Sequence, residues 1–229
     1  MIGVIVNVIT VLVGSCIGLL FKKGIPEKVS KAVMIGLGVC TLYIGISGSL
    51  CGENVLIIIG SVVLGAITGT LLNIDGAINR LAQRVEQRFQ RDGKQTSVAE
   101  GLVTATLLFC VGSMTVTGSI QAGLTGDNSV LITKATLDLV SSMLLASSLG
   151  IGVLLSAGTV FIIQGGLVLL AGVLSPVMTT GAINEMTCAG SLLIIMIGTN
   201  LMGISKFKVA DYLPAIVFAP IIYNIVLLF

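Results

Sequence analysis

Long apolar runs, separated by short charged or Gly-, Asn- and Pro-containing breaks, cover most of the chain. The length of each run is close to the number of residues, about 20, that a helix needs to cross a hydrocarbon core about 30 Å thick. The run at 131–174 is too long for one span, and its natural turn is at 150–152. The pattern predicts an all-α polytopic membrane protein, residues 1–229 as a single membrane domain, with eight helices at 2–21, 32–50, 54–73, 99–119, 130–149, 151–174, 187–204 and 210–229.

Composition supports a membrane protein and excludes several kinds of site. Of the 229 residues, 55% are hydrophobic and 10% charged, and the mean hydropathy is +1.12, all outside the usual range of soluble domains. The sequence contains no histidine, and its five cysteines show no CxxC spacing. We therefore expect no metal site, no cofactor and no histidine-assisted nucleophile. The net charge of +2 is too small to indicate a nucleic-acid partner.

The positive charges test the number of helices, because cytoplasmic loops collect Lys and Arg. With eight helices, all 12 basic residues except Lys134 fall on one side of the membrane. These residues are Lys22, Lys23, Lys28, Lys31, Arg80, Arg84, Arg88, Arg91, Lys94, Lys206 and Lys208. The count therefore places both termini outside.

The only sizeable segment between predicted spans is amphipathic. Apolar residues recur at helical spacing within 78–94, and four arginines occupy another face: Arg80, Arg84, Arg88 and Arg91. We expect a helix lying on the inner leaflet, with the lipid bilayer as its partner. The alternative is a surface that binds a regulatory partner.

A repeated tetrapeptide, GAIN, indicates an internal duplication. It occurs at 76–79 and 181–184, each time after an apolar run and before a Glu, an apolar helix, a Gly-polar-Gly segment, a Lys and an Asp. We interpret 54–149 and 151–229 as two repeats of three helices, preceded by a helix pair at 1–50. Because three is odd, the second repeat must be inverted, as in many secondary transporters.

Ionisable residues within or beside the spans are the first candidates for an ion or substrate site. Asp138 lies inside a predicted span with Lys134 one turn earlier, and the pair could equally serve only to neutralise itself. Glu100 and Glu185 open equivalent helices, where a carboxylate also simply complements a helix N-terminus. Asp211 is the repeat counterpart of Asp138.

Small and polar residues mark two further features. The segments 112–118 and 198–203 interrupt apolar spans, so Ser113, Thr115, Thr117, Thr199 and Asn200 could line a cavity beside unwound backbone; otherwise both segments are ordinary helix ends. Two GxxxG pairs favour close helix packing: Gly14 with Gly18, and Gly65 with Gly69. These glycine-rich faces could also form a homodimer.

Several segments resemble the bacterial inner-membrane family that includes YqgA and YdfK. They are FCVGSMTVTGSIQAGLTGD at 109–127, TKATLD at 133–138, LGIGVLLSA at 149–157 and GAINEMTCAGSLLIIMIGTNLMGI at 181–204. The resemblance implies the bacterial cytoplasmic membrane and covers essentially the whole chain, but it implies no catalytic residues, because the family's function is uncharacterised. Ser113 departs from the family pattern, in which we expect a proline, and this bears on how sharply the helix breaks there.

These features together favour a secondary transporter of a cation or small solute that works by alternating access. An ion channel is the nearest alternative, and a regulatory or scaffold membrane protein acting through the basic segment is another. We do not expect an enzyme, because the surroundings of Asp138 and Asp211 lack the glycine-rich setting of intramembrane aspartyl proteases.

Overall fold

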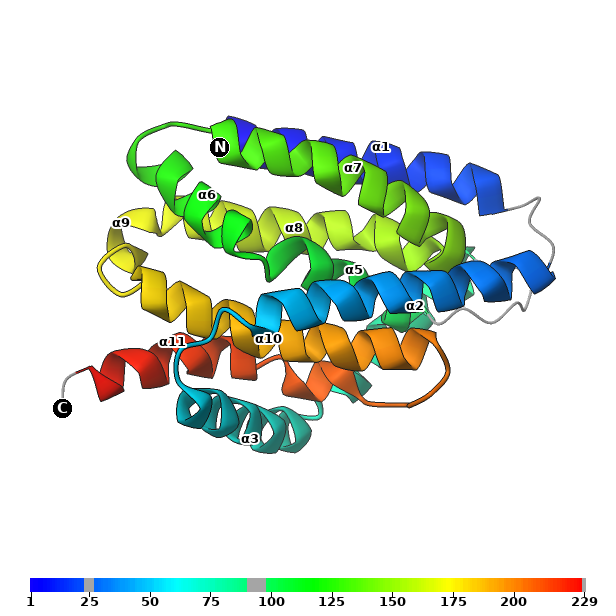
Figure 1. Ribbon diagram of the computed structural model, residues 1–229. Coiled ribbons are helices and arrows are strands. Elements are labelled where there is room, and N and C mark those ends of the chain that lie inside the picture. Colours follow the sequence, from blue (N-terminus) through cyan, green and yellow to red (C-terminus); the bar gives the residue numbers. More distant parts are fainter. Residues whose placement is uncertain (23–26, 90–97, 228–229) are drawn as a thin grey trace.

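Figure 1 shows the computed structural model, which describes residues 1–22, 27–89 and 98–227. Every regular element of these residues is helical. The elements are α1 (Ile2–Lys22), α2 (Glu27–Ser49), α3 (Val55–Leu72), α4 (Ile74–Phe89), α5 (Val98–Cys110), α6 (Ser113–Leu124), α7 (Ser129–Leu149), α8 (Ile151–Leu169), α9 (Ala171–Leu174), α10 (Thr180–Leu201), the 3-10 helix η1 (Val209–Tyr212) and α11 (Ala215–Val226).

The all-α membrane fold expected from the apolar runs is confirmed. Seven stretches in the described part are long and apolar enough to cross a membrane, the last formed by η1 and α11 together. The bent pair α5 and α6 brings the number to eight if it counts as one span.

The fourth predicted span, 99–119, is wrong as a single helix. The chain breaks at Val111 and Gly112, and α5 and α6 meet there at 60°. Gly112 is extended (φ −63°, ψ 146°), and the Thr115 hydroxyl donates to the carbonyl oxygen of Phe109 (2.9 Å), which the break leaves outside the helical ladder. A sharp bend therefore forms with Ser113 in place of a proline, and the segment after Gly112 is helical rather than unwound.

The seventh predicted span, 187–204, begins too late. Thr179 caps α10 by accepting a hydrogen bond from the Ala182 N–H (3.3 Å), so the helix starts at Thr180 and contains the second GAIN sequence. It continues to Leu201, so most of 198–203 is helical as well. Glu185 consequently lies in the second turn of α10 rather than before its first residue.

Other boundaries move for local reasons. Pro214 separates η1 from α11, because a proline cannot donate a backbone hydrogen bond, so the predicted helix at 210–229 is two pieces. The predicted span 151–174 is divided between α8 and α9. Residues 78–89 of the amphipathic segment 78–94 lie in α4, which begins earlier, and residues 90–94 fall outside the described residues. Helix α2 begins at Glu27 instead of residue 32.

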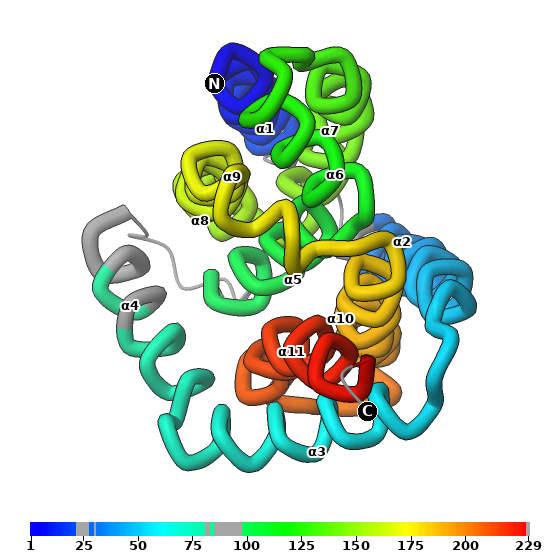
Figure 2. Tube along the Cα trace, turned by 90° about the vertical axis from the view of Figure 1, so that its left-hand side faces the viewer, coloured from blue at the N-terminus to red at the C-terminus, as the bar shows by residue number. Residues whose placement is uncertain are grey.

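The helices pack around α10. In its apolar 18-residue stretch 78% of the residues are buried inside the protein, against 17–44% in the other spans that consist of a single helix. Figure 2 shows α10 between α2 and α11, with α3 and α4 at the periphery. The α1 and α7 pair and the α2 and α10 pair make the most extensive contacts. Gly14 and Gly18 let α1 approach the backbone of α7 closely, and Gly65 and Gly69 do the same for α3 against residues 211–215.

The two ends of the bundle differ. Figure 1 places the N-terminus and the end of α11 toward one end, together with the start of α10. The end of α1, the start of α2 and the loop after α10 lie at the other, where Lys28, Lys31, Lys206 and Lys208 are exposed. The basic residues of separate loops thus share one end of the molecule.

Candidate functional site

Four buried polar side chains from three helices meet inside the bundle. Asn7 of α1 donates from Nδ2 to Oδ2 of Asp138 in α7 (3.0 Å) and to Oε1 of Gln164 in α8 (3.2 Å). Lys134 forms an ion pair with the same Asp138 oxygen from one turn earlier in α7. None of the four residues is more than 6% exposed. We call Asn7, Lys134, Asp138 and Gln164 the polar cluster.

The polar cluster places two opposite charges near the middle of an apolar span. Placing a charge there costs about 2.5–3.5 kcal/mol on insertion scales, so each charge needs a partner. The Lys134 ammonium also lies 5.9 Å from the centroid of the Phe109 ring, which stabilises a cation electrostatically. Within the described residues, Nε2 of Gln164 has no hydrogen-bond partner. A cation that competes with Lys134, or a proton on Asp138, would break the ion pair and rearrange these groups.

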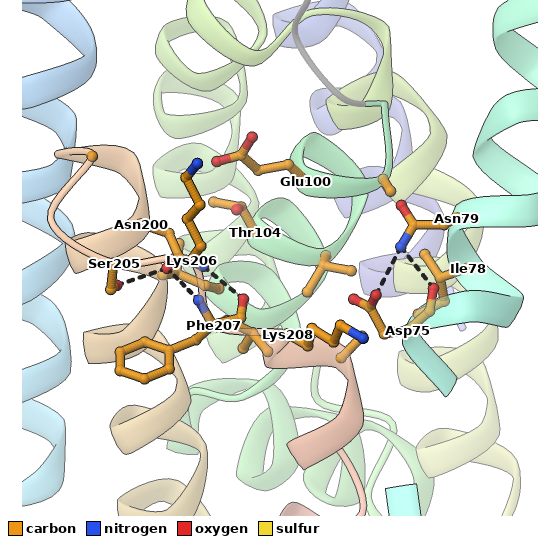
Figure 3. Close-up of a pocket in the computed structure, with 16 residues that line it drawn as sticks. Asp75, Ile78, Asn79, Glu100, Thr104, Asn200, Ser205, Lys206, Phe207 and Lys208 are labelled. Carbon is orange, nitrogen blue, oxygen red and sulfur yellow. Dashed lines mark hydrogen bonds between the residues drawn. The ribbon is translucent and has the colours of Figure 1, made fainter. Parts of the chain in front are cut away.

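A second polar site is a cavity of about 430 Å³ at the basic end of the bundle (Figure 3). The start of α4 and the first turns of α5 form one side, and the end of α10, the following loop and η1 form the other. Its charged lining residues are Asp75, Glu100, Lys206 and Lys208. Thr104, Asn79 and Ser205 add neutral polar groups, and the remaining walls are largely apolar.

Asn200 folds the loop that carries the two lysines. Its Oδ1 accepts hydrogen bonds from the Ser205 hydroxyl (2.7 Å) and the Phe207 N–H (2.9 Å), and its Nδ2 donates to the Phe207 carbonyl oxygen (2.9 Å). The Ser205 hydroxyl also lies 2.7 Å from the Thr199 hydroxyl oxygen. Gly203 takes φ +73° in the turn, a conformation that favours glycine. Asn200 and Thr199 therefore support one wall of the cavity.

Asp211 joins the two sides of the cavity. Its Oδ1 accepts a hydrogen bond from the Asp75 N–H (2.9 Å) at the start of α4, and the residue is buried. The backbone carbonyl oxygen of Asp211 lies where a Cβ on Gly69 would be. A residue larger than glycine at position 69 would therefore keep α3 from approaching η1 this closely. Asp211 consequently lies apart from the polar cluster, although it is the predicted repeat counterpart of Asp138.

Glu185 lies in a third place, toward the opposite end of α10. It is fully buried, and its Oε1 accepts from the N–H groups of Glu53 and Asn54 (2.8 Å each) in the turn between α2 and α3. In the part of the chain that the structure describes, Oε2 has no partner. Beside it, burial raises the pKa of the Cys51 thiol. From the helical rise, Glu185 is about 22 Å from Asn200 along the helix axis, so the two lie in separate sites.

The remaining predicted residues line neither the polar cluster nor the cavity. Ser113 is exposed at the start of α6, and Thr115 is buried at the bend. Thr117 is exposed and donates to the Ser113 carbonyl oxygen within its own helix. Arg80 and Arg84 are exposed on α4, and Arg88 lies in the same helix. Arg91 falls outside the described residues.

Several lining residues were not among the predicted site residues. Asp75 and Asn79 lie in the first two turns of α4 and Thr104 lies in α5, and only the folded chain brings them together, although Asn79 closes the first GAIN sequence. Lys206 and Lys208 were used as evidence for topology and for the repeat, and not as site residues. A signal was present, because these lysines follow the Gly-polar-Gly segment that contains Asn200.

Comparison with known proteins agrees with this description. Over 230 residues the chain is 33% identical to an "Uncharacterized membrane protein YdfK" of Bacillus subtilis (strain 168), covering 99% of this chain and 97% of that protein. It is 29% identical over 221 residues to an "Uncharacterized protein YqgA" of Escherichia coli (strain K12), covering 95% and 94% of the two chains. No solved structure matches the chain significantly. The model of a family described as "Protein of unknown function (DUF554)" matches residues 2–224, and the chain therefore belongs to the DUF554 family of membrane proteins.

Proposed function

We propose that this protein is a secondary transporter of a cation or small solute that works by alternating access. The observation that carries the proposal is the buried Lys134 and Asp138 ion pair within a predicted membrane span, held by Asn7 of another helix. Ionisable groups are rarely retained at such depth without a role in moving ions or substrates. No catalytic activity is part of this proposal.

Two further features support a carrier. The bend at Gly112 divides one predicted span into two half-helices, and discontinuous helices are common in secondary transporters. The cavity at the basic end gives a solute a place to bind from that side, while the polar cluster lies deeper and offers a site for a coupling ion. An ion that weakens the Lys134 and Asp138 pair would then favour one arrangement of α1, α7 and α8 over another.

The charge distribution supports an orientation. The exposed lysines gather at the cavity end, so the positive-inside rule assigns this end to the cytoplasm of a bacterial inner membrane and both termini to the outside. A single cysteine added at the N-terminus of a cysteine-free variant should react with a membrane-impermeant maleimide in intact cells. Reaction only after the membrane is opened would reverse the orientation.

The test of transport is flux into proteoliposomes under imposed gradients of Na⁺, K⁺ or protons. Wild type should show a saturable, gradient-driven flux, and Asp138→Asn should abolish it while the protein remains folded. Thr136→Val is the matched control, since Thr136 is exposed on the same helix and donates only to the Ile132 carbonyl oxygen. Flux that does not saturate would favour a channel, and flux unaffected by Asp138→Asn would remove the pair from the mechanism.

A further inference from the structure

Glu185 carries a buried carboxyl group without a basic partner. It lies in the second turn of α10, the most deeply buried span, and the residue is fully buried. Among the described residues, no lysine or arginine forms an ion pair with it. A buried charge without a counter-ion is costly, because it loses its hydration and gains nothing of opposite sign. Binding a proton removes that charge.

The two oxygens of this carboxyl group have different surroundings. Oε1 accepts hydrogen bonds from the N–H groups of Glu53 and Asn54 (2.8 Å each), directly before the first turn of α3. Oε2 is buried and has no hydrogen-bond partner among the described residues. A proton can therefore be added at Oε2 without breaking an existing hydrogen bond, while Oε1 remains an acceptor. The geometry thus accommodates both the charged and the protonated carboxyl group.

Oε2 lies just beneath the turn between α2 and α3. A Cβ on Gly52 would be 3.6 Å from Oε2, and Gly52 is half-buried in this turn. A residue without a side chain therefore covers the oxygen on that side. The next residue, Glu53, is exposed, so the protein surface is one residue away. A small opening of the turn would bring Oε2 into contact with water.

Few other titratable groups lie near the Glu185 carboxyl group. The Cys51 and Cys188 thiols each donate to a backbone carbonyl oxygen. Glu53 is exposed, and the Tyr223 hydroxyl of α11 contacts the preceding turn of α10. Helices α3 and α6 contain no titratable residue, and the charged residues of α2 and α5 lie beside the other end of α10. A change with pH at this site can therefore be assigned by comparing Glu185 with Glu53.

The hydrogen bonds at Oε1 hold the turn between α2 and α3 against α10. Figure 1 shows this turn beside the first half of α10. The carboxylate faces the N-terminus of α3, where the helix dipole favours a negative charge. A hydrogen bond to a charged acceptor is about twice as strong as one between neutral groups. Protonation would therefore weaken the contact between Glu185 and the turn without abolishing it.

We propose that Glu185 is a proton-binding site, and that a proton on Oε2 loosens the turn between α2 and α3 from α10. With the orientation supported above, the proton comes from the outside of the membrane. The inference names a proton as a ligand of the proposed transporter and rests on that function only for its role in flux. Proton binding and loosening of the turn can both be measured without transport.

The first test is infrared difference spectroscopy of the full-length protein in lipid as the pH is lowered. A protonated carboxyl group has a C=O stretching band that the carboxylate lacks. Acidification should produce such a band in wild type that is missing in Glu185→Gln. Glu53→Gln is the matched control and should retain the band, because Glu53 is an exposed carboxylate in the same turn. Identical spectra of wild type and Glu185→Gln would show that Glu185 takes up no proton, and would overturn the proposal.

Backbone hydrogen exchange tests the loosening of the turn. After correction for the intrinsic rate at each pH, protection of the Glu53 and Asn54 amides in wild type should fall about fivefold or more across the infrared titration. Glu185→Gln should show the lower protection at every pH, because its neutral amide oxygen is a weaker acceptor, and Glu53→Gln should follow wild type. Protection that stays constant in wild type would refute the loosening, and this arm of the test needs no variant to fold.

The outcomes also separate this inference from the proposed transport function. Proton uptake at Glu185 with no flux in proteoliposomes would retain the site and reject the carrier. Gradient-driven flux with no proton uptake at Glu185 would retain the carrier and reject the site.

Discussion

Asn7 in the first helix donates a 3.0 Å hydrogen bond to Asp138, 131 positions later in the chain. The same amide group reaches Gln164 at 3.2 Å, so one side chain of α1 joins α7 to α8. The α1 backbone can come this close because Gly14 and Gly18 have no side chain at the contact with α7. The close packing of α1 against α7 at the two glycines and the hydrogen bonds of Asn7 thus depend on each other.

Replacing Asn7 by Leu should lower the free energy of unfolding by about 1–3 kcal/mol. Both amide hydrogen bonds are lost, while Asp138 and Gln164 stay buried with fewer partners. Reversible unfolding in mixed detergent would measure the change. Thr136→Val serves as control and should stay within about 0.5 kcal/mol of wild type, as surface substitutions usually do. A loss no larger than the control's would mean that Asn7 contributes little to the cluster.

The Lys134 and Asp138 pair should show strong coupling. Asp138→Leu alone leaves a buried ammonium group without its counter-ion, and the expected loss is about 3–5 kcal/mol. The double variant Lys134→Met with Asp138→Leu removes both charges and should be more stable than Asp138→Leu alone.

A double-mutant cycle of unfolding free energies measures this coupling. Additive losses in the two single variants would show that the charges do not depend on each other. The double variant can also be tested for flux. If it is stably folded but shows no flux, the Lys134 and Asp138 pair is needed for transport and not only for stability.

The membrane fold was predictable because the bilayer fixes the length of a span, and apolar runs of that length are visible in the sequence. The ends of the helices were predicted less well from the sequence. The first turns of α10 contain Asn184 and Glu185, whose polarity argued against a span. In the folded chain the Glu185 carboxylate accepts hydrogen bonds from the N–H groups of Glu53 and Asn54, which are 132 and 131 positions away. The burial of Glu185 therefore depends on tertiary contacts.

The candidate site was only partly predictable for the same reason. The spacing of Lys134 and Asp138 is local, so their contact could be expected from a helix alone. The cavity depends on three separate stretches of the chain, 75–79, 99–104 and 197–210. Two of the residues that support its walls have roles other than those expected from the sequence. Asn200 was expected to line a cavity beside unwound backbone; it does line the cavity, but from the end of a regular helix, and it folds the loop that follows. Asp211 was expected to match Asp138, and it instead holds the start of α4.

The glycines of α1 offer a direct test of helix packing. A Cβ on Gly14 would overlap the Leu139 carbonyl oxygen and the Ser142 hydroxyl of α7, whereas a Cβ on Gly36 of α2 meets nothing within 4 Å. Gly14→Ala should therefore lower the free energy of unfolding by about 1–3 kcal/mol through overpacking. Gly36→Ala should be neutral, or stabilising by up to about 1 kcal/mol from helix propensity.

Thermal unfolding of both alanine variants, prepared in the same detergent, gives the comparison. Equal midpoints would show that α1 and α7 separate easily enough to admit a methyl group, which the close packing of Gly14 argues against.

The loop that carries Lys206 and Lys208 should be loosened by Asn200→Ala. The substitution removes the acceptor of the Ser205 hydroxyl and the Phe207 N–H, and the donor to the Phe207 carbonyl oxygen. Because these contacts lie at the exposed end of α10, global stability should change by less than about 1 kcal/mol, within the range of surface substitutions. Backbone hydrogen exchange across residues 203–208 should nevertheless accelerate by about tenfold or more, since local opening no longer breaks these bonds. Asn224→Ala is the control, because Asn224 donates to the carbonyl oxygens of Val177 and Pro220, away from the cavity. If exchange in the loop is equal in the two variants, Asn200 does not hold the segment that carries the two lysines.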